Sequence, residues 1–259
     1  MRKNLTLTLT AAACLLLIGC SSSTESKKAE EKQAPPAAAP APTPEAPKAA
    51  EAPAPTPPLP ELKKPEVNPA PKTPTAKTLP ETAPEDFTVH MDTSKGLVVM
   101  ECHKSWSPRG ADHFYDLVKL HFYDDSRFFR VIRSPRLFMA QFGINGTPAT
   151  NSVWANATFP DDPPAGKHNT RGMVTYGQTS AKNSRSTQLF INYTDNSFLD
   201  SQGFTPVCSV TSGMDAVDQF YSGYGESPNQ ALIGSQGNAY LNSQFPRLDY
   251  IKKATIVLQ

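Results

Sequence analysis

Apolar and polar residues alternate along several short stretches in the last two thirds of the chain. Residues 87–91 and 97–102 both show this pattern, and a turn-forming segment, 92–96, separates them. Alternation with a period of two is typical of strands that bury one face, so these stretches predict a β-hairpin. Residues 250–258 alternate in the same way, and we expect this last strand to close the sheet.

Two other stretches show helical spacing. Ser107 and Pro108 are typical of a helix start, and apolar residues then recur every three or four positions as far as His121. A second helix is predicted over residues 213–221. His113 and His121 have no acidic or cysteine partner at the spacing of a metal site, so the sequence predicts no bound metal.

The remaining apolar stretches are short and rich in β-branched and aromatic residues, which favour strands. Long loops are expected over residues 143–170, where Gly, Asn, Pro and Asp are frequent. Many short strands with two helices predict a mainly β fold, a barrel whose ends the helices cap. The strands expected between the hairpin and the last strand cover residues 128–132, 137–142, 173–176, 187–192 and 204–210.

One arginine, Arg130, lies inside an apolar strand-like stretch. A charge in such a place must project onto a surface or into a groove. By itself the pattern leaves two interpretations open. The Arg130 side chain either extends from the barrel wall into solvent without a function, or it takes part in a functional site. The polar tract 223–244 also allows two interpretations. It is either a short helix near a groove or a flap that selects clients.

The N-terminus has the form of an export signal. Arg2 and Lys3 precede an apolar stretch that is too short to span a membrane with ordinary flanks. It ends at Cys20, and this junction resembles the lipobox of bacterial lipoproteins, in which the cysteine is lipidated. Ser21 follows, which by that resemblance favours the outer membrane of Gram-negative bacteria. We therefore expect residues 1–19 to be a signal peptide and the protein to be lipid-anchored in the envelope, facing the periplasm.

Residues 20–85 contain 17 of the 26 prolines and few residues that could form a core. This composition predicts a disordered linker, rich in Pro, Ala, Glu and Lys. Residues 86–259 then form one globular domain, which we expect to be monomeric. The net charge of +1 gives no reason to expect a nucleic-acid partner.

Two cysteines, Cys102 and Cys208, lie in the globular part. An exported compartment permits a disulfide, but the sequence does not show that the two residues are close. Two small buried cysteines are the favoured interpretation, and a disulfide is the alternative.

Four blocks of sequence, in order, resemble the cyclophilins, a family of peptidyl-prolyl cis-trans isomerases. They are Phe-Phe-Arg-Val-Ile at 128–132, Phe-Met-Ala-Gln-Phe-Gly at 138–143, the stretch from Gly172 to Ile191, and residues 198–204. The resemblance covers most of residues 87–258. It implies an eight-stranded antiparallel barrel closed by two α-helices, in agreement with the pattern above.

The resemblance also implies roles for individual residues. Arg130 corresponds to the catalytic arginine of the family, and Gln141 and Gln188 to the amides that hold the substrate backbone. The substrate-binding residues implied are Phe138, Met139, Phe190 and Leu199 in the wall of the proline pocket, Tyr176, Gly177, Gln178 and Thr179 beside the residue before proline, and Phe198 and Phe204.

Several positions depart from the family pattern. Phe129 replaces the histidine that usually precedes the arginine, and Phe198 stands where many members have tryptophan. Tyr176 and Gly177 replace a usual Met-Ala pair, and Gly203 or Phe204 falls where histidine is common. These changes bear on substrate preference more than on the reaction.

The function predicted from the sequence is isomerisation of prolyl bonds in exported or envelope proteins, with no cofactor. The arginine would donate a hydrogen bond to the prolyl nitrogen in the twisted transition state. The expected partners are proline-containing polypeptides. Two alternatives are open, a chaperone or peptide-binding lipoprotein with the same fold that does not catalyse, and a purely structural module. No Gly-x-Ser-x-Gly motif supports a hydrolase.

Overall fold

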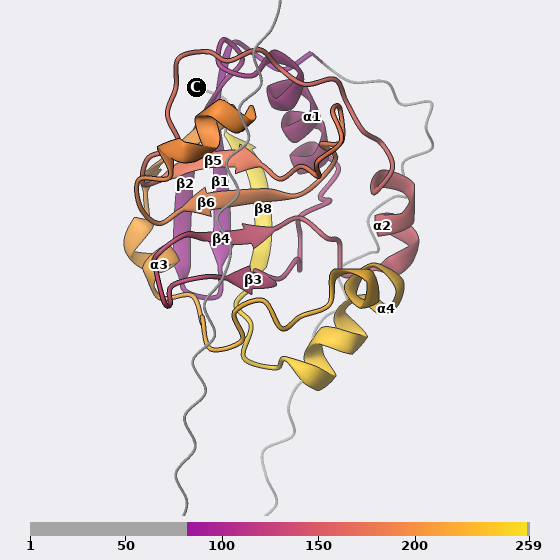
Figure 1. Cartoon of the computed structure of the whole chain (residues 1–259). Coiled ribbons are helices and arrows are strands. Elements are labelled where there is room, and N and C mark those ends of the chain that lie inside the picture. The colour runs from indigo at the N-terminus through magenta and orange to yellow at the C-terminus, as the bar shows by residue number, and fades with distance from the viewer. Residues whose placement is uncertain (1–81, 258–259) are drawn as a thin grey trace, which may run out of the picture. The chain divides into compact units, whose positions relative to one another are not determined.

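A computed structural model describes residues 82–257, which form a curled antiparallel sheet with helices around it (Figure 1). The predicted signal peptide, Cys20 and nearly all of the predicted linker lie outside the described residues. The strands are β1 (Asp86–Thr93), β2 (Gly96–His103), β3 (Arg130–Val131), β4 (Met139–Phe142), β5 (Met173–Tyr176), β6 (Leu189–Asn192), β7 (Pro206–Ser212) and β8 (Ile251–Val257).

All eight strands belong to one sheet, in the order β3-β4-β6-β5-β7-β2-β1-β8. The predicted hairpin is confirmed as β1 and β2, which pair from Asp86 opposite His103 to Thr93 opposite Gly96. The last strand, β8, pairs with β1, as expected. The end strands β3 and β8 do not pair with each other, and an isolated bridge between Arg127 and Tyr250 joins the segments just before them, so the sheet forms a curled half-barrel rather than a closed ladder.

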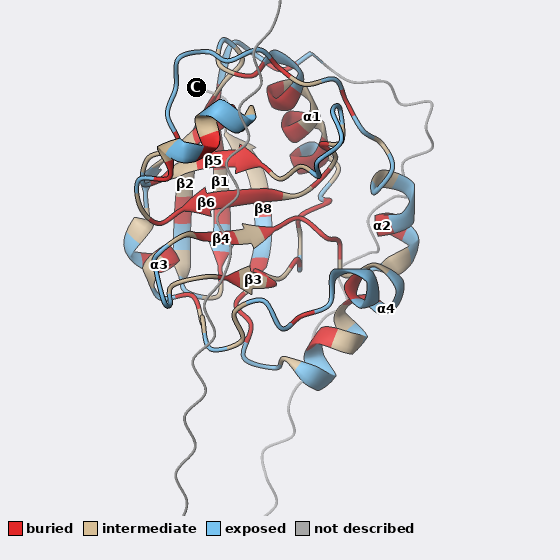
Figure 2. Cartoon of the chain, viewed as in Figure 1, coloured by how far each residue is buried: buried red, intermediate tan, exposed pale blue. Residues whose placement is uncertain are grey.

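Apolar side chains of the strands and of α1 form one large buried cluster, and Figure 2 shows the buried residues concentrated in the strands and on α1. The central strand β6 is buried along its whole length. Two core tyrosines satisfy their hydroxyl groups internally, since Tyr123 donates to the Thr187 carbonyl at 3.0 Å and Tyr176 to the Gly110 carbonyl at 3.2 Å. Ala83, which the sequence assigned to the linker, is also part of this core.

The helices are more numerous than the two that the sequence predicted. Both predicted helices exist, as α1 (Pro108–Lys119) and α3 (Met214–Asp218), and α1 packs against β2 and β8 while α3 packs against β2. The second is shorter than the predicted range 213–221. The structure adds α2 (Pro148–Trp154), α4 (Gln230–Gln244) and a 3-10 helix, η1 (Ser197–Gln202).

Helix α2 corrects the prediction that residues 143–170 are loops throughout. It begins with Thr147 followed by Pro148, a start signal like that of α1, but its seven residues are too few to show helical periodicity. Helices α2 and α4 lie side by side at one flank of the sheet (Figure 1). The tract left open at 223–244 is therefore largely a helix.

Glycine is required at one position in α4. Gly237 has φ of 61°, and a Cβ there would lie 2.0 Å from the Gly146 carbonyl oxygen. The next residue, Asn238, donates its backbone N–H to that carbonyl at 2.9 Å. The close approach fixes α4 to the segment that precedes α2.

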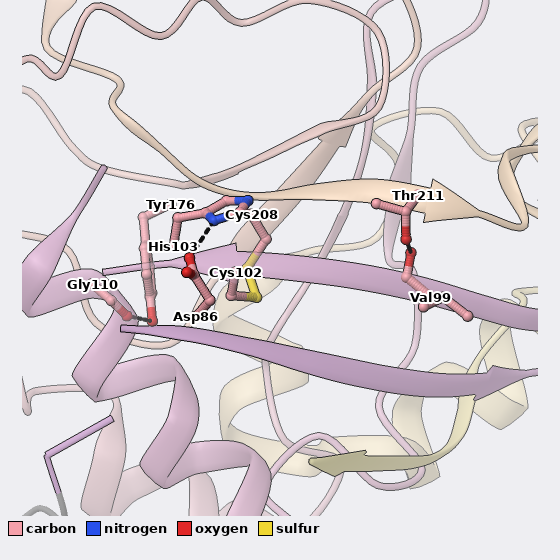
Figure 3. The surroundings of a disulfide bond; sticks show 8 residues. All are labelled: Asp86, Val99, Cys102, His103, Gly110, Tyr176, Cys208 and Thr211. Atoms are coloured by element: carbon pink, nitrogen blue, oxygen red, sulfur yellow. Dashed lines mark hydrogen bonds and ion pairs between the residues drawn. A yellow bond between two sulfur atoms is a disulfide. The ribbon is translucent and has the colours of Figure 1, made fainter. Parts of the chain in front are cut away.

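Cys102 and Cys208 form a disulfide, so the favoured interpretation of two free buried cysteines was wrong (Figure 3). The two residues lie directly opposite each other on β2 and β7, although 106 positions separate them in the sequence. Both are buried, as expected. The alternation of β2 placed Cys102 on the core face, but only the pairing of β2 with β7 brings Cys208 beside it.

We expect reduction of this disulfide to lower the free energy of unfolding by about 2–4 kcal/mol, because the link closes a long loop and restricts the unfolded chain. Urea denaturation with and without reductant measures the change. The double variant Cys102→Ala/Cys208→Ala is the control, since its unfolding should not respond to reductant. An unchanged midpoint for the reduced wild type would contradict the prediction.

Candidate active site

A pocket of about 510 Å³ opens on the outer face of the sheet where β3, β4 and β6 lie side by side. The residues that line it come from these strands, from the loop after β5, from η1 and its following loop, and from the two helices at the flank. They are Arg130, Phe138, Met139, Gln141, Ala155, Gly177, Gln178, Thr179, Ser184, Ser186, Gln188, Phe190, Leu199, Phe204 and Gln230.

The floor of the pocket is apolar. Met139 on β4, Phe190 on β6 and Leu199 in η1 form a buried cluster of their own, separate from the barrel core. Phe138 and Phe204 pack at its edge, and the Phe190 and Phe204 rings meet edge to face at 6.0 Å. Such a floor suits a compact apolar ring better than a charged or extended group.

A row of polar side chains runs along one side of this floor. Arg130 lies opposite Gln141 in the β3–β4 ladder, and its Nη1 donates to Gln141 Oε1 at 3.2 Å. Gln141 in turn donates from Nε2 to Gln188 Oε1 at 2.8 Å. The same Nη1 lies 3.9 Å from the sulfur of Met139, so one edge of the guanidinium faces the apolar floor.

The other edge of the guanidinium is held by an acid that the sequence reasoning missed. Arg130 Nε donates to Glu226 Oε1 at 2.6 Å, and Nη2 forms an ion pair with the same oxygen. Glu226 lies in the polar tract before α4, 96 positions from Arg130. No local pattern marks it as a partner.

The structure brings eleven of the thirteen residues predicted as catalytic or substrate-binding into the pocket lining. The three predicted catalytic residues, Arg130, Gln141 and Gln188, lie together in the lining and are linked by hydrogen bonds. The other eight are Phe138, Met139, Gly177, Gln178, Thr179, Phe190, Leu199 and Phe204.

Tyr176 does not line the pocket, which corrects the sequence prediction. It lies opposite Leu189, whose side chain faces the barrel core, so its own side chain points into the core as well (Figure 3). Burial raises the pKa of its phenol well above the usual value. Gly177, the next residue, reaches the pocket and donates its N–H to the Gln188 carbonyl at 2.9 Å.

Phe198 is the second predicted residue outside the lining. Its side chain is 49% exposed and stacks on the outer side of Phe138, with ring centroids 6.1 Å apart. It therefore supports a wall residue from behind. The lining residues that the sequence did not single out are Ala155, Ser184, Ser186 and Gln230, which lie in loops or in unpredicted helices.

Within residues 82–257, no group of three or more His, Cys, Asp or Glu side chains is placed to hold a metal ion. In the same part of the chain, no helix is both long and apolar enough to cross a membrane.

His113 lies behind the pocket, among the rings of Trp154, Phe159 and Tyr176. Burial lowers the pKa of its imidazole to about 4, against a smaller opposing effect of a hydrogen bond with the backbone of Ser186. Ser186 lines the pocket, so this uncharged histidine supports the wall from the core side.

Comparison with known proteins agrees with this geometry. Residues 88–233 match the family model described as cyclophilin type peptidyl-prolyl cis-trans isomerase/CLD. The chain belongs to the cyclophilin family. Among curated proteins, it is 34% identical to the peptidyl-prolyl cis-trans isomerase of Acinetobacter baylyi over 135 residues, which are 51% of this chain and 70% of that protein.

Two further comparisons support the assignment. Peptidyl-prolyl cis-trans isomerase B of Escherichia coli is 30% identical over 138 residues, which are 51% of this chain and 82% of that protein. A crystal structure of a Cryptosporidium parvum cyclophilin, determined in the presence of the dipeptide Ala-Pro, matches with a TM-score of 0.50 at 18% identity. This match covers 66% of this chain and 99% of the Cryptosporidium parvum chain, and it shows that the two folds are similar.

His113 should make the stability of this cyclophilin depend on pH. Its pKa is near 6.5 in the unfolded chain and about 4 in the folded one, so unfolding takes up a proton between these values and stability falls as the pH is lowered. From pH 7 to pH 5 we expect a loss of about 2 kcal/mol from this residue. Urea titrations of the wild type and of His113→Phe at both pH values measure it.

His121→Gln is the matched control, because His121 is largely exposed at the end of the same helix region. The phenylalanine variant should lose most of the pH dependence, and the glutamine variant should keep it. An equal pH slope in all three proteins would contradict the assignment.

Proposed function

We propose that the chain is a peptidyl-prolyl cis-trans isomerase that binds proline-containing segments of exported or envelope proteins and helps them to fold. The observation that carries the proposal is the position of Arg130, whose Nη1 lies near Met139 of the apolar floor while Gln141 and Gln188 follow beside it. Membership of the cyclophilin family supports the same activity.

The chemistry requires little from the protein beyond orientation and charge. A prolyl bond is held planar by amide resonance, with a barrier of about 18–20 kcal/mol. When the bond twists, the nitrogen regains its lone pair and can accept a hydrogen bond. A donor aimed at this nitrogen stabilises the twisted state and not the planar one, which is the condition for catalysis.

Arg130 is the donor in this proposal. A guanidinium is always protonated in proteins and offers several N–H groups in a fixed plane. Met139, Phe190 and Leu199 would hold the proline ring, and Phe138 would close one side. With the ring fixed, the group on the other side of the prolyl bond is the part that rotates.

Gln141 and Gln188 would bind the backbone of the substrate. Their side chains are linked to each other and to Arg130, so the position of each depends on the next. Gly177, Gln178 and Thr179 lie on the side of β6 away from β4, where the residue before proline would run. No covalent bond is made or broken, so the reaction needs no nucleophile or general base.

Arg130→Ala should lower kcat/KM for an Ala-Pro peptide by about 100-fold, which is the usual effect of removing one donor to a transition state. Arg136→Ala is the matched control, because Arg136 is an exposed arginine of the neighbouring turn that does not line the pocket. A coupled proteolysis assay or exchange NMR measures the rate, and circular dichroism checks the fold.

A wild-type rate no faster than in buffer would exclude the enzyme. If proline peptides still shifted the NMR signals of Phe138 and Phe190, the alternative of a non-catalytic peptide-binding or chaperone module would remain. The absence of such shifts would leave only the structural module.

We further propose that the protein is a monomeric lipoprotein anchored through Cys20 and facing the periplasm from the outer membrane. The support is the sequence alone, an apolar leader that ends at a cysteine followed by Ser21, and then a proline-rich tract before the first strand. Such a tract could act as a spacer between membrane and domain.

Cys20→Ala should release the protein from membranes, because the variant lacks the thiol to which the proposed acyl chains would be attached. Mass spectrometry should detect acyl chains on the wild type and none on the variant. Cys14→Ala, a change inside the leader, is the matched control and should leave anchoring intact. Fractionation of cells expressing each variant measures the outcome. A Cys20→Ala protein that still sediments with outer membranes would contradict the lipid anchor.

A further inference from the structure

The segment between α3 and α4 reaches the edge of the pocket through Glu226, which contacts the lining residue Arg130. Two successive turns define it, in which Gly225 N–H donates to the Ser222 carbonyl at 3.0 Å and Ser227 N–H to the Tyr224 carbonyl at 2.9 Å. The side chain of Asn229 then caps α4 by accepting from the N–H groups of residues 231 and 232 at 2.9 and 3.1 Å. Glu226 lies between these constraints.

Helix α4 is held against the sheet by an apolar cluster that includes the residue before Arg130. Phe129 is buried beneath the helix, where the cluster joins it to Ile144, Ile233, Leu241 and Leu248. The Phe129 ring therefore forms part of the surface on which α4 packs. The strand that carries Arg130 and the segment that carries Glu226 are therefore anchored to the same cluster.

The contact with Glu226 occupies the outer edge of the guanidinium. Glu226 Oε1 accepts from Nε and contacts Nη2, while Nη1 stays directed at Gln141 and Met139. The inward edge therefore remains available for a substrate. The acid does not cover the reacting side of Arg130.

Glu226 also changes the charge at the pocket mouth. Among the described residues that line the pocket, Arg130 is the only charged one. Without the acid, a substrate would meet a lone cation. The Glu226 side chain is 64% exposed, so its carboxylate faces solvent where a bound chain would leave the pocket.

The sheet order indicates which part of the substrate passes this carboxylate. The strands run β3-β4-β6-β5, and the proline floor lies on β4 and β6. The residue before proline would lie beside 177–179, after β5. The residue after proline would then cross toward β3, where Arg130 and Glu226 lie.

We propose that Glu226 is a specificity-determining residue that favours clients with lysine or arginine directly after the proline and disfavours those with aspartate or glutamate. This inference rests on the proposed isomerase function. The carboxylate acts through its own charge on the substrate, and its partial exposure makes the effect sensitive to salt.

The test compares the full-length wild-type chain with Glu226→Gln, which keeps the size of the side chain and removes its charge. Asp218→Asn is the matched control. Asp218 is also a surface acid paired with an arginine, Arg171, and neither residue lines the pocket. Each protein is given Ala-Ala-Pro-Lys, Ala-Ala-Pro-Ala and Ala-Ala-Pro-Glu peptides with blocked ends. Exchange NMR reads both the isomerisation rate and the dissociation constant in the same samples.

We expect the ratio of kcat/KM for the lysine peptide to that for the glutamate peptide to fall about tenfold in Glu226→Gln at low salt. The ratio should be unchanged in Asp218→Asn. At about 1 M salt, where the Debye length is about 3 Å, the wild type and the glutamine variant should converge. A purely structural role of Glu226 would change all three peptides equally and would leave the ratio unaltered.

An unchanged ratio in an active Glu226→Gln protein would overturn the inference, as would an equal change in Asp218→Asn. A wild type that does not isomerise the alanine peptide would instead refute the proposed function. In that case the ratio of the dissociation constants tests Glu226 independently, and the same value in wild type and variant would overturn the inference.

Discussion

The arrangement of the site depends on the register in which β3, β4 and β6 pair. Arg130 lies opposite Gln141, and Gln141 lies opposite Phe190, so the three side chains share the outer face of the sheet. Their neighbours Val131, Ala140 and Ile191 face the core. Because side chains alternate between faces, a slip of one residue would turn the arginine inward and expose the core. The buried face therefore fixes the geometry of the exposed one.

Much of the fold could be predicted because its information is local. The alternation in β1 and β2 and the start of α1 at Ser107-Pro108 each depend on a few consecutive residues. The apolar floor and the row from Arg130 to Gln188 were identified through motifs that resemble a known family. The alternation of apolar and polar residues and the family motifs together were enough to predict most of the strands and most of the pocket lining.

What could not be predicted depends on contacts between distant segments. The bond between Cys102 and Cys208 requires that β2 and β7 be neighbours, which no stretch of sequence reveals. Glu226 contacts Arg130 across 96 positions of sequence, in a segment that leads into α4, and α4 itself packs on Phe129. Tyr176 was misplaced for a different reason, since the motif identified the right segment but only the pairing with Leu189 shows which face its side chain takes.

Strand β3 has two residues and lies at the end of the sheet, where it pairs with β4 alone. The segment before it is tied to the start of β8, since Phe128 N–H donates to the Asp249 carbonyl at 2.9 Å and Ile251 N–H to the Ser126 carbonyl at 2.9 Å. Local opening of such an edge costs less free energy than global unfolding, so this strand can fluctuate while the barrel core stays intact. Because α4 packs on Phe129, the residue before Arg130, such an opening would also separate this residue from the helix, and the position of the arginine depends on a helix as well as on the sheet.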